Sequence, residues 1–129
     1  DSKTGLWYQV VNRGSESANW LETSSSSMYT FVIARASEEG YVDKRYNSVA
    51  KRGYAGVLTK ISLDQNRMTN LTDICEGTNV ADLPYYYGRK RLTNDLHGLG
   101  AFLIMNEKFM NKTLKARTRG FWKAGKEKR

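Results

Sequence analysis

The clearest helical pattern in the chain lies in YNSVAKRGYAGVLTKI, residues 46–61. Apolar and small residues recur there at helical spacing over about four turns, at Tyr46, Val49, Ala50, Gly53, Tyr54, Val57, Leu58 and Ile61. Each interior glycine costs about 1 kcal/mol relative to alanine, so Gly53 and Gly56 predict close approach of a neighbouring helix. The stretch is expected to form one amphipathic helix capped by Asp43.

A preceding helix is expected over about residues 24–39. The run Thr23–Ser27 supplies several N-cap candidates, and Gly40 is suited to end the helix. The residues expected to face the core share one helical side: Met28, Phe31, Val32 and Ala36. The short connection through residues 38–42 predicts that the two helices are antiparallel neighbours, an αα-hairpin.

The rest of the chain contains one more helical pattern. It begins at the capping residues Asn94 and Asp95 and is expected to end near Asn111, with Leu99, Phe102, Leu103 and Met110 approximately on one side. Residues 3–11 are expected to be extended, whereas residues 62–91 have no helical period and predict a turn, short extended pieces and a loop. The fold class expected is all-α with short extended segments in the loops.

Composition indicates one globular domain whose positive charge is concentrated at one end. The chain has 129 residues, 40% of them hydrophobic, and a formal net charge of +8. Residues 112–129 hold five lysines and three arginines against Glu127, a local charge of +7 that leaves +1 for the rest. An anionic partner such as nucleic acid is therefore relevant to this tail and not to the body. Cys75 is the single cysteine, so no intramolecular disulfide is expected, and no histidine or cysteine spacing fits a zinc site.

Several polar and aromatic residues have two open interpretations. Asp95 and His97 form either a cap with a first-turn residue or part of a pocket rim. The serines Ser24–Ser27 either cap a helix or join its free N–H groups in binding a carboxylate or phosphate. The aromatic residues in or near predicted loops are either core or a stacking platform for a sugar or base: Trp7, Tyr8, Trp20 and Tyr85–Tyr87.

Five blocks occur in order along residues 1 to about 107. They read DSKTGLWYQVV with NWLETSSSSM (1–11 and 19–28), GY (40–41), AKRGYAG (50–56), NLTDIC (70–75), and TND with GLGAF (93–95 and 98–102). In this order and spacing, the blocks resemble the second half of the unsaturated rhamnogalacturonyl and glucuronyl hydrolases, which are glycoside hydrolase families 105 and 88.

The resemblance implies an (α/α)6 barrel, in which helical hairpins form an inner and an outer ring around a carbohydrate pocket. Residues 1–111 are then expected to form a partial barrel domain, about its C-terminal half, and residues 112–129 a basic tail. In these enzymes an aspartate protonates C4 of a terminal unsaturated uronic acid and activates water for C5, and the resulting hemiketal collapses to release the next sugar. The resemblance implies no metal or organic cofactor.

The aspartates that transfer the proton belong to the first half of such barrels. No residue of this chain inherits their role, so the chain alone is expected to be inactive. Its pocket-lining candidates are Trp7, Gln9, Ser24, Ser25, Arg91, Asn94 and His97. The expected partners are an unsaturated uronic-acid oligosaccharide and either the missing barrel half or a second copy of the chain.

An alternative is a small helical module that binds nucleic acid through the basic tail. Phe121 and Trp122 interleave aromatic rings with the tail's positive charges, and such binding would collapse with added salt. A solvated helix extension explains the tail more simply, because the body carries no RNA-binding motif. No apolar run approaches the roughly 20 residues that span a bilayer, so no membrane partner is expected. The sequence does not distinguish a cytoplasmic from a periplasmic location.

Overall fold

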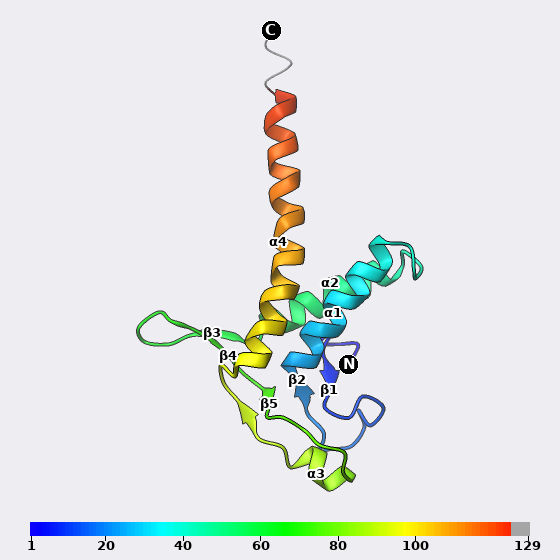
Figure 1. The fold of residues 1–129 in the computed structure, drawn as a ribbon, viewed down its shortest axis with the longest axis vertical. Helices are drawn as coiled ribbons and strands as arrows, with labels where there is room; N and C mark the ends of the chain where they lie inside the picture. Colours follow the sequence, from blue (N-terminus) through cyan, green and yellow to red (C-terminus); the bar gives the residue numbers. More distant parts are fainter. Residues whose placement is uncertain (125–129) are drawn as a thin grey trace.

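Two helices, α1 (Thr23–Glu38) and α2 (Tyr46–Leu58), pack together as the hairpin expected from the sequence. The computed structural model describes the backbone of residues 1–124 and the side chains of residues 1–110. A longer helix, α4 (Leu96–Ala124), packs beside α1 and extends well past the hairpin, as Figure 1 shows. The short helix α3 (Leu83–Tyr87) lies at the opposite end of the molecule from the end of α4.

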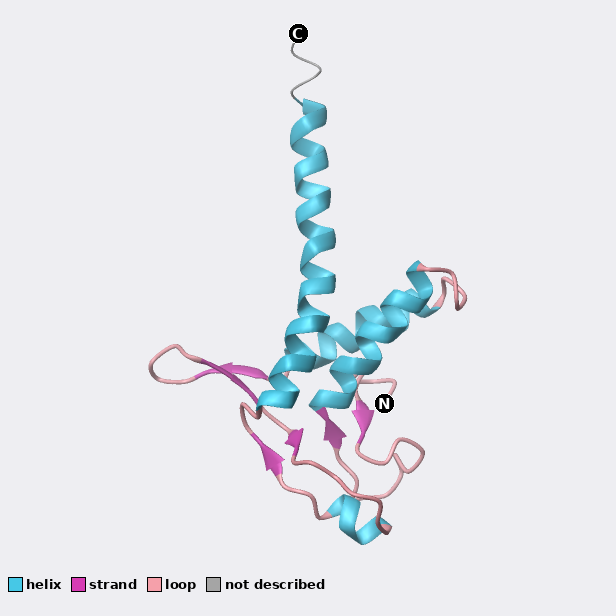
Figure 2. Ribbon diagram, in the orientation of Figure 1, coloured by secondary structure: helices cyan, strands magenta, loops and turns pink. Residues whose placement is uncertain are grey.

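Short strands gather at the end of the molecule where α1 and α4 begin (Figure 2). They form three antiparallel pairs: β1 (Trp7–Tyr8) with β2 (Leu21–Glu22), β3 (Ile61–Leu63) with β4 (Thr69–Leu71), and β5 (Ile74–Cys75) with β6 (Arg91–Leu92). Helices still make up most of the described chain. The expected all-α class is therefore right about the helices and incomplete about their connections, which pair as ladders.

The core lies where α1, α2 and α4 meet. Its fully buried residues are Leu6, Val57 and Met105, and the side chains packed around them are Leu21, Phe31, Tyr54, Phe102 and Phe109. The ring of Tyr54 stacks on that of Phe109 with 4.3 Å between centroids, and its hydroxyl donates to Asn106 Oδ1 at 2.8 Å. Burial raises the pKa of this phenol. These contacts join α2 to α4 directly.

The inward face of α1 matches the expected one only in part, because Phe31 packs against the core but Met28 and Val32 do not. Met28 and Val32 are 52% and 56% exposed, whereas the buried residues of the helix are small and mostly polar: Thr23, Ser24, Ser26, Ser27, Thr30, Ala34 and Ser37. The hydroxyls of Ser26 and Ser27 are satisfied within the helix, because they donate to the carbonyls of Glu22 and Thr23. Small residues let the backbone of α2 come close, as its glycines predict: a Cβ on Gly53 would overlap Thr30 Oγ1.

Two expected helix ends are also wrong. Helix α2 stops at Leu58 instead of Ile61, because Thr59 N–H and Thr59 Oγ1 both bond the carbonyl of Gly56, and Ile61 begins a strand. Helix α4 continues past Asn111 to Ala124. Lysine, leucine, alanine and arginine all favour helix, and no proline interrupts this segment.

The binding role expected for the basic tail falls on residues 112–129, outside the residues whose side chains are described. Over the part of the chain that is described, no helix combines the length and apolar character required to cross a membrane.

Candidate functional site

A buried carboxylate closes the N-terminus of α1. Glu22 is 1% exposed, and its Oε1 accepts from Ser24 N–H at 3.0 Å, Ser24 Oγ at 2.8 Å and Cys75 N–H at 2.9 Å. Its Oε2 accepts from Ser25 N–H at 2.5 Å. A carboxylate at this position compensates the positive end of the helix. Anion binding was one of two open interpretations of these serines, and the N–H groups of Ser24 and Ser25 are already bonded within the chain, which favours the capping interpretation.

Gln9, Trp20, Cys75 and Arg91 form a group of side chains beside this cap, which we call the strand cluster. Gln9 Nε2 donates to Cys75 Sγ at 3.1 Å, and Gln9 N–H donates to the carbonyl of Trp20 at 2.8 Å. Cys75 and Arg91 are directly opposite each other on β5 and β6, so their side chains leave the ladder on the same face. The guanidinium carbon of Arg91 lies 4.8 Å from the ring centroid of Trp20. The cluster combines an amide, a cation and aromatic surface.

Trp7 adjoins the strand cluster through the first ladder. It pairs with Glu22 across β1 and β2, and its backbone N–H donates to Ser26 Oγ at 2.9 Å. The centroid of its ring lies 5.6 Å from the centroid of the Tyr29 ring, with 60° between the two ring planes. Trp7 is half-buried. The structure thus holds Trp7, Gln9, Ser24, Ser25 and Arg91 at the end of the molecule where α1 begins.

Asn94 and His97 lie at the start of α4. Asn94 has a φ of 60° and makes two bonds with the backbone of Leu71, accepting its N–H at 2.8 Å and donating to its carbonyl at 2.9 Å, so it fastens α4 to β4. His97 Nδ1 lies 2.5 Å from Asp95 Oδ1, which also accepts His97 N–H as the cap of the helix. No hydrogen bond or ion pair among the described residues joins either side chain to the strand cluster.

His97 opens instead onto an apolar groove of about 460 Å³ between α1 and α4. The other lining residues are Met28, Phe31, Val32, Gly100, Ala101 and Ile104. Ser25 shares the helical side of Met28 and Val32, and its enclosed hydroxyl has no hydrogen-bond partner among the described residues. The groove therefore lies on the same side of α1 as Ser25, in the turns that follow it.

The tyrosines considered as a stacking platform hold loops together. Tyr85 and Tyr86 accept the N–H groups of Asn79 and Ala81 at 3.1 and 3.2 Å. The hydroxyl of Tyr87 donates to Glu16 Oε2 at 2.5 Å, and this bond raises the pKa of the phenol. All three hydroxyls are engaged, which favours a structural role.

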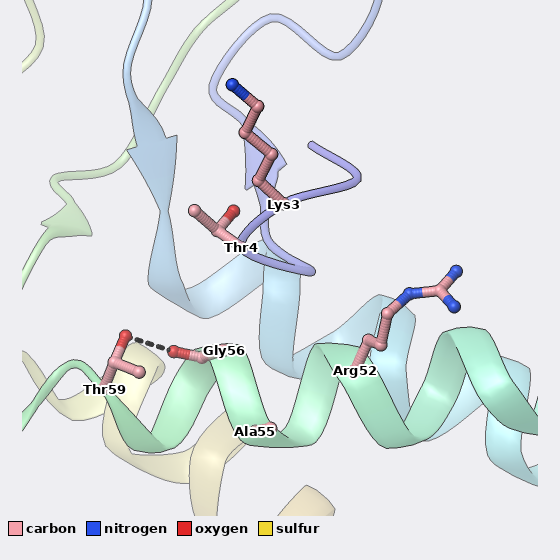
Figure 3. Close-up of a pocket in the computed structure, with 6 residues that line it drawn as sticks. All are labelled: Lys3, Thr4, Arg52, Ala55, Gly56 and Thr59. Carbon is pink, nitrogen blue, oxygen red and sulfur yellow. Dashed lines mark hydrogen bonds between the residues drawn. The ribbon is translucent and has the colours of Figure 1, made fainter.

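A second pocket, of about 400 Å³, lies between the N-terminal segment and α2 (Figure 3). It contains two cationic side chains, Lys3 and Arg52. The figure shows them pointing in different directions, so they do not converge on one anion. Among the described residues, no three histidine, cysteine, aspartate or glutamate side chains are grouped so that they could hold a metal ion.

Two members of the site were missed from the sequence. Glu22 is not among the residue types preferred as N-caps, although an acid directly before the helix start was a usable signal. Cys75 joins the site through contacts between distant segments, and these leave no local pattern. Trp20, which the sequence left open as core or stacking platform, is buried and lies under the guanidinium of Arg91.

Burial of Cys75 gives a prediction for its reactivity. The thiol is buried, and desolvation raises its pKa, so less thiolate forms at a slightly alkaline pH than in the unfolded chain. We expect an aromatic disulfide reagent to modify Cys75 at least about tenfold more slowly in the native chain than in urea at the same pH. Free cysteine measured in both solutions corrects for the effect of urea. Equal corrected rates would contradict the buried position.

The chain matches the model of Glycosyl Hydrolase Family 88 over residues 1–112. It is 25% identical over 117 residues to the 24.9 kDa protein in the picA locus of Rhizobium radiobacter, covering 80% of this chain and 50% of that protein. The chain thus spans about half the length of the curated relatives it matches.

Solved structures of similar fold come from family 105. The C. acetobutylicum ATCC 824 glycoside hydrolase from family 105 superposes with a TM-score of 0.80 and 27% identity, over 86% of this chain and 33% of that one. A possible family 105 member from Klebsiella pneumoniae gives 0.73 and 22% identity over 85% and 27%, a likeness of fold alone. With the family model matched over nearly the whole described chain, this protein belongs to glycosyl hydrolase family 88.

Proposed function

We propose that the chain is part of an (α/α)6 barrel that hydrates the double bond of terminal unsaturated uronic acids. The oligosaccharides would derive from pectin or glycosaminoglycans. The family match over residues 1–112 carries this proposal. The chain covers only a third of the family 105 structure from C. acetobutylicum, so we assign it a share of the sugar site and not the whole reaction.

In the proposed reaction, water adds across the C4–C5 double bond. A proton goes to C4 and the hydroxyl to C5, and the hemiketal formed at C5 opens to release the next sugar. The aspartates that move the proton are placed outside these 129 residues. The contribution of this chain is therefore binding and orientation of the uronic-acid ring.

The strand cluster and its neighbours supply the binding groups. Gln9 donates its amide N–H to Cys75 Sγ, and its Oε1, which has no hydrogen bond to another described residue, would accept from a sugar hydroxyl. Trp7 offers a half-buried aromatic face, and Arg91 offers an exposed guanidinium. Ser25 and His97 border the groove beside the cluster, whereas Ser24 and Asn94 act indirectly by fixing Glu22 and Leu71.

The apolar groove has a different proposed role. Its residues Met28, Val32 and Ile104 are each more than half exposed, and Leu103 beside them on α4 is 61% exposed. Apolar helix faces of this kind are normally buried against further helices. We propose that other helices of the barrel, or those of a second copy of the chain, cover this groove.

The proposal is tested by titrating the chain with an unsaturated uronic-acid disaccharide. We expect saturable binding by calorimetry and no loss of the ultraviolet absorbance of the double bond. Gln9→Ala removes one hydrogen bond of about 1 kcal/mol, so binding should weaken about fivefold.

Gln65→Ala is the matched control, because Gln65 is exposed in the turn between β3 and β4. It should leave the affinity unchanged. Equal weakening by the two variants, or the absence of saturable binding, would count against the sugar site. Turnover by the chain alone would show that the catalytic aspartates had been placed wrongly.

A further inference from the structure

Arg91 is an exposed cation held by an aromatic ring. Its guanidinium carbon is 4.8 Å from the centroid of Trp20, and no carboxylate among the described residues pairs with it. The nearby Arg89 differs, since it is largely buried, forms an ion pair with Glu76 at 3.4 Å and donates to the carbonyl of Gly77. The charge of Arg89 is thus already compensated, and that of Arg91 is available to a ligand.

Trp20 is a rigid platform for this guanidinium. It is 4% exposed, its backbone N–H donates to Asn19 Oδ1 at 3.1 Å, and its backbone carbonyl accepts Gln9 N–H. Asn19 is itself fixed by donating to the carbonyls of Val10 and Arg13 at 2.8 and 3.0 Å. A guanidinium resting on a fixed ring keeps its N–H donors directed outward, in the fork that matches a carboxylate.

The ring beneath Arg91 also carries an unused donor. Trp20 Nε1 is buried and has no hydrogen-bond partner among the described residues. Buried donors without an acceptor are uncommon in folded proteins, and a water oxygen beside the ring would satisfy this one. The unsatisfied indole and the uncompensated guanidinium belong to the same stacked pair.

The position of Arg91 relates it to the proposed sugar site. Arg91 lies directly across the ladder from Cys75, and Cys75 Sγ accepts Gln9 Nε2 at 3.1 Å. Paired side chains on one face of a ladder have Cβ atoms about 5 Å apart. A sugar ring whose hydroxyl reaches Gln9 therefore has its neighbouring substituents within range of Arg91.

The N-terminus of α1, which carries partial positive charge, is not available to a ligand. The N-terminus of α1 is filled by the carboxylate of Glu22, which accepts the N–H groups of Ser24 and Ser25. A ligand's carboxylate therefore cannot bind at the N-terminus of α1, whereas Arg91 offers a group with matching charge and geometry.

Building on the proposed function, we propose that Arg91 binds the carboxylate of the uronic acid and that Trp20 positions its guanidinium. Arg91 is then the residue that distinguishes an acidic sugar from its neutral counterpart. Trp20 acts through Arg91 and does not need to touch the substrate.

The test compares an unsaturated uronic-acid disaccharide with its methyl ester at constant ionic strength. For Arg91→Gln we expect about tenfold weaker binding of the acid and unchanged binding of the ester, since a charge-assisted bond of about 1.4 kcal/mol is lost. Arg91→Lys should restore only part of the affinity, because lysine lacks the planar fork. Lys90→Gln removes the same charge one residue away and should change neither affinity.

A second readout separates this inference from the proposed function. The Nε–H resonance of Arg91 should shift saturably with glucuronate and not with glucose, and Trp20→Phe should weaken that shift. A shift with no disaccharide binding would uphold the carboxylate site and count against the barrel activity. No shift, or an Arg91→Gln variant that binds acid and ester as the wild type does, would overturn the assignment to Arg91 even where the sugar still binds.

Discussion

Replacing Glu22 with alanine is expected to lower the free energy of unfolding by about 3–5 kcal/mol. The substitution leaves four donors without their acceptor: the N–H groups of Ser24, Ser25 and Cys75 and the hydroxyl of Ser24. A buried donor left unsatisfied costs about 1–3 kcal/mol, and part of the sum is offset because a buried charge is also removed. Urea unfolding followed by circular dichroism measures the change.

The effect should extend from α1 to β5. Glu22 joins the first turn of α1 to Cys75, and Thr23 adds bonds to the carbonyls of Thr72 and Asp73 at 2.7 and 2.9 Å. Loss of the carboxylate should therefore speed hydrogen exchange at the amides of Ser24, Ser25 and Cys75 more than at the far end of α1.

Two further variants make the Glu22 prediction decisive. Glu22→Gln keeps one acceptor oxygen and should cost about half as much, which preserves a measurement if the alanine variant does not fold. Glu39→Ala at the other end of α1 removes an exposed glutamate paired with Arg35 and should cost less than about 1 kcal/mol. Equal losses for the alanine variants of Glu22 and Glu39 would contradict the anchoring role of Glu22.

Helices were predictable in this chain wherever apolar spacing and tertiary packing agree. Helix α2 follows the pattern of Ala50, Gly53 and Val57, all of which are buried. For α1 the pattern was right about Phe31 and wrong about Met28 and Val32, since close approach by α2 selects small residues and leaves these two exposed. Periodicity reports amphipathicity, but it does not say which side meets a neighbouring helix and which side forms a groove.

The candidate site was predictable only in part. Gln9, Trp7 and Arg91 were named from a resemblance and from polarity in predicted loops, and the structure brings them to one end of the fold. Glu22 was passed over in favour of the serines that follow it, although their N–H groups are its donors. The links of Cys75 to residues 9 and 22 span more than fifty positions, so no spacing rule within one element reveals them.

Gly53→Ala is expected to destabilise the chain by about 2 kcal/mol, although alanine is intrinsically better than glycine within a helix by about 1 kcal/mol. The new Cβ would overlap Thr30 Oγ1 and lie 3.2 Å from the ring of Trp7. Thr30 is fully buried, so its side chain has no open space into which it can move. Gly100→Ala is the matched control: a Cβ there meets nothing within 4 Å, and the variant should gain about 0.5–1 kcal/mol.

Thr30→Ala should rescue Gly53→Ala, because it removes the oxygen that the new Cβ strikes. That hydroxyl has no hydrogen-bond partner among the described residues, so the single Thr30→Ala change should cost less than about 1 kcal/mol. A double-mutant cycle by urea unfolding should then give a favourable coupling of at least about 1 kcal/mol between the two positions. Additive effects, or a loss at Gly53 no larger than at Gly100, would mean that α1 and α2 are not packed through this contact. A favourable coupling of that size would show that the inward polar face of α1 fixes the distance between the two helices. Because Trp7 also borders Gly53, the same contact would then fix the position of Trp7 beside the candidate site.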